Sequence, residues 1–173
     1  MPKINFRFSV PIALLILAVC AGAVYLHSRL GPDGRDTLKF GAALLGGVTG
    51  VYALLLNVQA RRAAAANKFI ERWNDPKFLD CRKSIGEVSN SGTITDAADV
   101  HQVRIGLNFF EEIAISIHRK EADEEIVKDF FLTVMLVFFR ASQPWIVERR
   151  KANNQPTVFC QYEKLYRKWE PKV

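Results

Sequence analysis

Residues 40–58 read FGAALLGGVTGVYALLLNV, and this stretch contains no charged side chain. A helix needs roughly 20 mostly apolar residues to cross a bilayer core of about 30 Å. Residues 10–26, VPIALLILAVCAGAVYL, form a second uncharged stretch close before the first. The pair predicts a transmembrane hairpin in residues 1–59, with spans at about residues 8–27 and 38–58.

The N-terminal apolar stretch has an alternative interpretation as a cleaved signal peptide. Lys3 and Arg7 precede the stretch, and small residues at 21–23 resemble a cleavage site. Pro11 at its start and Tyr25 near its end argue against a signal peptide. The second span that follows so soon favours a hairpin.

Positive charges favour one orientation of this hairpin. Lys3 and Arg7 lie before the first span, and the basic residues after the second span are Arg61, Arg62 and Lys68. The cations of the connecting loop are partly offset by Asp33 and Asp36. Because positively charged flanks stay on the cytoplasmic side, both termini and the soluble domain are predicted to be cytoplasmic.

The second span contains a face of small residues. Gly46 and Gly50 form a G-x-x-x-G pair, and Ala42 extends this face by one turn. Such faces allow helices to approach closely in lipid. The face can pack on the first span or on neighbouring subunits, and the second possibility predicts an oligomer.

Residues 60–173 have the sequence of a helical bundle with about four to five helices. Helix starts are predicted at Asp75-Pro76 and at Asp123, where an aspartate can cap the first turn. Residues 130–139, FFLTVMLVFF, are uncharged, but they are too few to span a bilayer and suit a buried core helix.

The end of this bundle is predicted from its turn residues. Pro144 is expected to kink or end the core helix, and Thr157 is expected to open the last helix. No segment alternates between apolar and polar residues as a strand would. The predicted fold class is therefore all-α.

One polar constellation stands out in the bundle. Arg104, Asn108, Glu111 and His118 follow one strip of a predicted helix. The strip is either a ligand or switch site, or a polar network that pairs with another helix, for example through Arg140 or Arg149. The second interpretation is favoured.

Composition argues against most catalytic and metal sites. Residues 1–59 carry five Lys or Arg and two Asp or Glu, and residues 60–173 carry nineteen against sixteen, so each part has a net charge of +3. This excess is too even for a nucleic-acid groove.

Cys20, Cys81 and Cys160 are far apart, which argues against a disulfide framework or a zinc site. No phosphate loop, metalloprotease motif or nucleophile elbow occurs, so we assign no catalytic residue, metal or cofactor.

Several stretches of residues 60–170 together carry a family resemblance. They are NKFIERWNDPKF (67–78), LNFFEEIAISIHRKEADEEIVKDFF (107–131), and the pair Trp145-Ile146 followed by ERR and by YEKLYRKW (162–169). The chain resembles a bacterial and phage family known as domain of unknown function 4760. Its members join one or two membrane helices to this helical domain, and no activity follows from the resemblance.

The layout is also similar to that of the small membrane accessory protein of RNA-targeting type VI CRISPR systems, which assembles a pore-like oligomer. The Arg-to-His spacing of the HEPN ribonuclease motif is missing here. The leading hypothesis is a non-enzymatic bacterial inner-membrane protein whose cytoplasmic domain oligomerises or senses a partner and acts on the membrane. It rests on this likeness in architecture and on the absence of a recognisable catalytic motif.

The sharper form of this hypothesis is an antiphage or CRISPR-associated pore. The expected partners are the lipid bilayer, further copies of the chain and a protein of a defence system, rather than nucleic acid. Two alternatives stay open, a membrane-anchored divergent HEPN-like nuclease and a passive scaffold for a partner protein.

Overall fold

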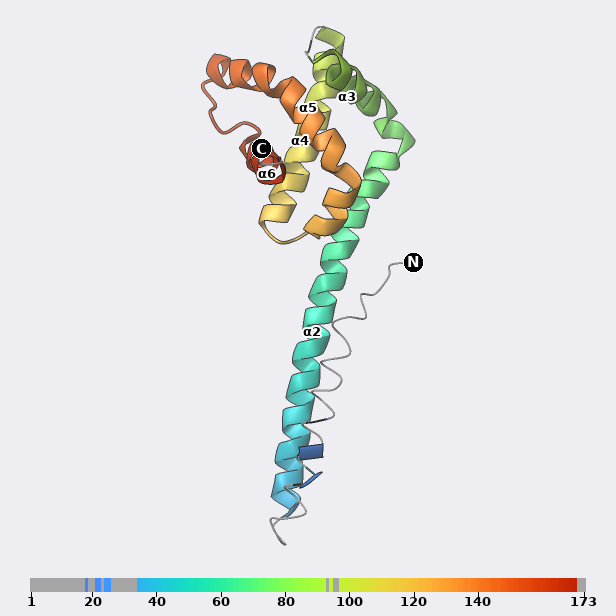
Figure 1. Ribbon diagram of the computed structural model, residues 1–173, viewed down its shortest axis with the longest axis vertical. Coiled ribbons are helices and arrows are strands. Elements are labelled where there is room, and N and C mark those ends of the chain that lie inside the picture. The colour runs from blue at the N-terminus through green and yellow to red at the C-terminus, as the bar shows by residue number, and fades with distance from the viewer. Residues whose placement is uncertain are drawn as a thin grey trace. The chain divides into compact units, whose positions relative to one another are not determined.

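The computed structural model describes residues 34–92, 94 and 97–170, together with residues 18, 21, 22, 24 and 25. Within these residues all regular elements are helices and no strand occurs, which confirms the all-α prediction for this part (Figure 1). In chain order the elements are α2 (Gly34–Asn74), the short 3₁₀ helix η1 (Pro76–Phe78), α3 (Leu79–Ser91), α4 (Ala97–His118), α5 (Glu124–Ala152) and α6 (Cys160–Trp169). Apart from the single positions named above, the predicted first span at 8–27 lies outside the described residues.

The chain divides into two compact units, Met1–Val58 and Gln59–Val173. In the first unit, α2 exposes large apolar side chains along residues 40–58. Phe40 is 67% exposed and Leu54 is 66% exposed. An apolar surface of this extent is unfavourable in water and favourable in a hydrocarbon environment.

Two helical segments of the described residues are long and apolar enough to cross a membrane, Lys39–Asn74 and Glu124–Ala152. The apolar window of the first is 0% buried, whereas the window of the second is 39% buried. A core helix of a soluble domain satisfies the same criteria of length and composition. The inner side of α5 belongs to the core, because Phe131, Met135 and Phe138 are each at most 1% exposed.

Aspartate caps begin two helices of the second unit, as predicted. The side chain of Asp75 accepts a hydrogen bond from the backbone N–H of Lys77 at 2.8 Å, and Pro76 follows it as the first residue of η1. Asp123 accepts from the N–H groups of Glu125 and Ile126 at 3.0 and 3.2 Å. These bonds satisfy donors that a helix leaves free at its first turn.

The C-terminal third of the bundle differs from the prediction. Pro144 lies inside α5, which continues to Ala152, so of the two predicted outcomes, a kink or an end, the end is excluded. A proline removes a single helical hydrogen bond, and the packing of Ile146, which is 1% exposed, helps to hold the helix beyond it. The last helix begins at Cys160 instead of Thr157, because Phe159 adopts a left-handed conformation with φ 55°.

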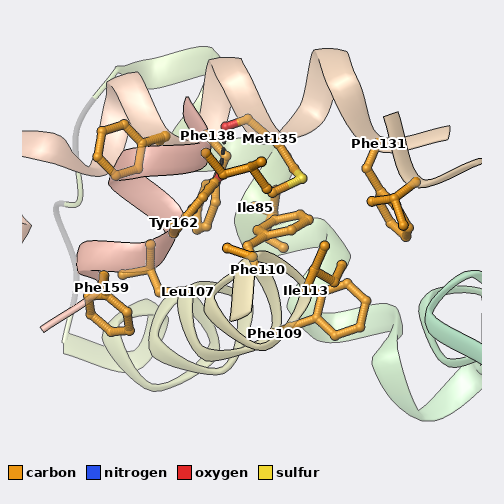
Figure 2. Packing of buried hydrophobic residues seen from close by; sticks show 14 of the residues in the cluster. Ile85, Leu107, Phe109, Phe110, Ile113, Phe131, Met135, Phe138, Phe159 and Tyr162 are labelled. Carbon is orange, nitrogen blue, oxygen red and sulfur yellow. Dashed lines mark hydrogen bonds between the residues drawn. The ribbon is translucent and has the colours of Figure 1, made fainter. Parts of the chain in front are cut away.

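A layer of aromatic side chains forms the centre of the core (Figure 2). The Phe110 ring lies 5.7 Å from Trp73, 5.8 Å from Phe138 and 5.4 Å from Tyr162, measured between ring centroids. These rings come from α2, α5 and α6, so Phe110 on α4 joins three other helices. The Tyr162 hydroxyl donates to the Met135 carbonyl at 2.6 Å, which satisfies the one polar group of this ring.

We expect Phe110→Ala to lower the free energy of unfolding by about 3–5 kcal/mol, since it opens a cavity among four helices. The control is Phe130→Ala, because Phe130 is 45% exposed and should cost about 1 kcal/mol. Urea unfolding of the full chain in mild detergent, followed by circular dichroism, measures both. Equal losses would contradict the central position of Phe110.

Candidate functional site

The residues of the predicted polar strip lie in separate places in the structure. Arg104 and Asn108 line a groove between α4 and α5. Glu111 and His118 line a second hollow beside the start of α6. Arg140 lies apart from both and pairs with Glu170 at 3.5 Å. The strip is therefore not one network, and the switch role stays a prediction.

Glu111 connects α4 to α6. Its carboxylate accepts hydrogen bonds from the backbone N–H groups of Gln161 at 3.1 Å and Tyr162 at 2.6 Å. Phe159, the residue before α6, provides no side-chain cap. A carboxylate at a helix N-terminus satisfies free donors and interacts favourably with the helix dipole. Glu111 thus replaces the missing local cap.

The groove between α4 and α5 is a concave feature of the second unit. Its volume is about 250 Å³, and its walls come from α4, from the last turns of α5 and from the connection to α6. The lining residues are Val100, Arg104, Asn108, Trp145, Arg149, Asn153, Gln155, Val158 and Phe159. The lining therefore combines two cations, three amide side chains and an indole, and none of its described residues carries a carboxylate.

The two arginines of the groove make few interactions with the rest of the protein. The guanidinium of Arg149 lies over the Trp145 ring, 5.1 Å from its centroid. An Nη atom of Arg104 lies 3.5 Å from Nδ1 of His101, a weak hydrogen bond at best. Neither arginine forms an ion pair with another described residue. Both charges are thus available to an anionic ligand.

Hydrogen bonds to backbone carbonyl groups fix the connection between α5 and α6, which forms one wall of the groove. The Nε group of Arg150 donates to the Val158 carbonyl at 2.9 Å, and the N–H of Gln155 donates to the Arg150 carbonyl at 3.0 Å. The ring of Phe159 is 8% exposed, so the core holds this residue in its left-handed backbone conformation. Such strain persists only where the surroundings impose it.

Sequence reasoning found Arg104 and Asn108 and named Arg149 as a possible partner, but it missed Trp145 and Asn153 on the opposite wall. Trp145, Arg149 and Asn153 recur at intervals of four along α5, so they share one helix face. Arg104 and Asn108 show the same interval on α4. The available signal was that groove-lining residues recur at intervals of four on both helices. The sequence does not show that these two helix faces lie opposite each other.

The second hollow has a volume of about 470 Å³, and its lining includes Glu111, His118, Cys160 and Gln161. This mixture of carboxylate, imidazole and thiol resembles a nucleophilic site. The Glu111 carboxylate is already bound to two backbone N–H groups, so it is not free to orient His118. Among the described residues no group of three or more His, Cys, Asp or Glu side chains can hold a metal ion.

Cys81 is an unreactive thiol. It lies in the core at 2% exposure, and its Sγ contacts the Gln102 carbonyl at 3.4 Å. Burial raises the pKa of Cys81 to about 11, against a smaller opposing effect of Arg72. Because the thiolate is the nucleophilic form, Cys81 carries no chemistry near neutral pH.

The predicted packing residues of the membrane segment are exposed. Ala42, Gly46 and Gly50 have no side-chain cover from other described residues, and a Cβ atom at either glycine would meet nothing within 4 Å. Arg61 and Lys68 are exposed, while Arg62 is partly buried and its carbonyl accepts from the Asp123 N–H at 3.0 Å. Their proposed roles in oligomer packing and at the membrane surface remain predictions.

Glu163 lies at the centre of an ion-pair network on α6. It contacts Arg150 at 2.7 Å and Arg167 at 2.5 Å. Burial acts to raise the pKa of Glu163, but the hydrogen bonds and charges of the two arginines outweigh burial and hold the pKa below its ordinary value of 4.5. The charged form of Glu163 is thus the stabilising form.

Comparison with known proteins gives one result. Residues 40–169 match the family model described as Domain of unknown function (DUF4760). No curated protein and no solved structure matches the chain.

We expect Glu111→Ala to destabilise the protein by about 2 kcal/mol, because two N–H groups of α6 lose a charged acceptor. Hydrogen exchange of the Gln161 and Tyr162 amides should become faster. Glu112→Ala is the control, since the Glu112–Arg72 pair is about half exposed and contributes about 0–1 kcal/mol. Unchanged exchange at α6 in Glu111→Ala would refute the capping role.

We also expect a pH dependence from Glu163. The folded-state pKa is depressed, so its stabilisation is present above about pH 4.5 and is lost as the pH falls through the folded-state pKa. Glu163→Gln should lower the free energy of unfolding by about 1–3 kcal/mol at pH 7, and this difference should shrink below about pH 4. Thermal unfolding at several pH values measures it.

The control for this titration is Glu148→Gln, an exposed glutamate of α5 without an ion pair in the described structure. Its difference from the parent chain should stay small and independent of pH. A constant difference for Glu163→Gln from pH 7 to pH 3 would contradict the assignment.

Proposed function

This chain belongs to the family described as Domain of unknown function (DUF4760), and we propose that it is a non-enzymatic protein of the bacterial inner membrane. In this proposal residues 40–58 cross the bilayer. The unit Gln59–Val173 is a cytoplasmic binding domain that senses a partner or ligand. Its response is assembly of the chain into an oligomer that changes the membrane.

One observation carries the proposal: α2 contains both an exposed apolar stretch of bilayer length and a part of the domain core. Residues 40–58 bear no charge and expose their large side chains. Further along the same helix, Ala66 is 0% exposed and Trp73 packs against Phe110 at 5.7 Å. The membrane segment is therefore joined to the domain by continuous helical backbone.

The chemistry of the domain favours binding over catalysis. Among its described lining residues the groove presents cations, amides and an indole but no general base or nucleophile. In the second hollow, Glu111 is bound to α6, and in the core Cys81 is a neutral thiol. These observations support a domain that recognises a molecule without transforming it.

Small residues of α2 support the assembly step. Ala42, Gly46 and Gly50 lie on one face of the helix, and the exposed side chains Leu44 and Val48 lie on another. In lipid, where apolar burial gives no driving force, close backbone approach at small residues favours association. We assign the small face to contacts between copies of the chain.

The orientation and the biological setting complete the proposal. Arg61, Arg62 and Lys68 follow the span and favour a cytoplasmic domain. Similar layout in a membrane accessory protein of CRISPR systems supports the sharper form, in which a partner from a defence system triggers permeability. This likeness is one of architecture and not of shared chemistry.

The proposal predicts an oligomer in mild detergent that depends on the small face. Gly46→Leu and Gly50→Leu should shift the protein toward monomers in light scattering, because a large side chain separates the helix backbones. Gly47→Leu is the matched control, since Gly47 lies with Leu44 and Val48 on the bulky face. A monomeric parent chain, or equal effects at all three glycines, would refute this assembly.

The same variants test the action on the membrane. Under the conditions that activate its host system, the induced parent chain should collapse the membrane potential reported by a dye, and Gly46→Leu and Gly50→Leu should protect the potential. An oligomer that leaves the potential unchanged under every condition that activates its host system would indicate a passive scaffold instead.

A further inference from the structure

We propose that the groove between α4 and α5 binds a nucleoside monophosphate. The Arg104 and Arg149 guanidinium groups neutralise the phosphate, and the Trp145–Arg149 pair stacks against the base. The amides of Asn108, Asn153 and Gln155 hydrogen-bond to the base and sugar. This inference deepens the proposed function and rests on it, since it names the ligand that the domain senses.

The first step of the argument is the unbalanced charge of the groove. Two guanidinium groups line it, and none of its lining residues within the described part of the chain is acidic. Four other arginines of the domain contact carboxylates, for example Arg72 with Glu112 and Arg150 with Glu163, both at 2.7 Å. Two cations that line one hollow without such a partner among the described residues favour an anionic ligand, and guanidinium groups suit phosphate oxygens well.

The second step is the stacking surface. Trp145 is partly buried, and Arg149 covers one face of its ring. A guanidinium plane or an indole face accepts a nucleobase by stacking. A bare phosphate or a carboxylate would use the cations but not this surface, so the surface favours an anion that also carries a planar ring.

The third step is the set of free amides. Asn108 on α4, Asn153 at the end of α5 and Gln155 in the following connection surround the groove. None of these amide side chains hydrogen-bonds to another residue that the structure describes. Asparagine and glutamine amides pair with the donor and acceptor edges of bases. An acidic peptide would leave most of these groups without use.

The fourth step is size and preorganisation. A volume of about 250 Å³ lies just below the usual range of about 300–1,000 Å³ for ligand pockets, which favours a single nucleotide. Arg150 holds the Val158 carbonyl, and Glu111 holds the start of α6, so the wall carrying Gln155 and Val158 is fixed from both ends. A fixed wall reduces the entropy lost on binding.

The test uses the full chain in mild detergent and isothermal titration with AMP, GMP, CMP and UMP. At least one of these four nucleotides should bind at least tenfold more tightly than ribose 5-phosphate, which lacks the base. The same nucleotide should bind at least tenfold more tightly than its own nucleoside, which lacks the phosphate. Inorganic phosphate and a short Asp/Glu-rich peptide should bind more weakly still.

Groove variants should weaken the same binding. Arg104→Gln and Trp145→Leu should each reduce affinity at least tenfold, and Arg149→Lys should reduce it less than Arg149→Gln. Lys151→Gln is the matched control, since Lys151 is an exposed cation of α5 that does not line the groove. Circular dichroism and urea unfolding verify that each variant is folded.

Several results would overturn the site. They are equal affinity for inorganic phosphate and for all four nucleotides, tighter binding of the acidic peptide, or unchanged affinity in folded Arg104→Gln and Trp145→Leu. The oligomeric state, measured with and without the nucleotide, separates the two proposals. If a nucleotide binds but changes neither assembly nor membrane potential, the site is supported and the sensing function is refuted. If the chain assembles without binding any nucleotide, only the nucleotide site is refuted.

Discussion

The capping of α6 by Glu111 is the interaction on which the C-terminal half of the domain depends. Phe159 leaves the start of α6 without a local acceptor, so a carboxylate from α4 accepts the two N–H groups instead. This bond fixes where α6 begins, and thereby where Tyr162 enters the aromatic core. It also fixes one end of the connection that forms a wall of the groove.

Much of the fold follows from local rules that act within a few residues. The caps of Asp75 and Asp123 and the all-α class needed only neighbouring sequence. The sequence left open whether Pro144 kinks or ends its helix, because a proline acts locally, while the packing of Ile146 beyond it is a tertiary effect. The start of α6 was misplaced for the same reason, since its cap comes from a distant glutamate.

The candidate site was predictable only in part, because spacing along one helix does not show which other helix each side chain meets. The spacing of Arg104, Asn108 and Glu111 correctly indicated one side of α4, but side chains on one strip can face different neighbours. Arg104 and Asn108 meet α5, whereas Glu111 meets α6. Arg149 was only one of two possible partners and Trp145 was missed, because only the packing of the two helices brings this face of α5 opposite Arg104 and Asn108.

The same distinction between local composition and tertiary surroundings separates the two apolar helices. In α5, Lys128, Asp129 and Arg140 bracket the uncharged run closely, and one side of the run is buried by protein. In α2, residues 40–58 carry no charge, and their apolar window has no burial among the described residues. An apolar surface that the protein does not cover needs another apolar environment, and a bilayer supplies one of the right thickness. Charge spacing and burial together therefore favour α2 over α5 as the candidate membrane segment.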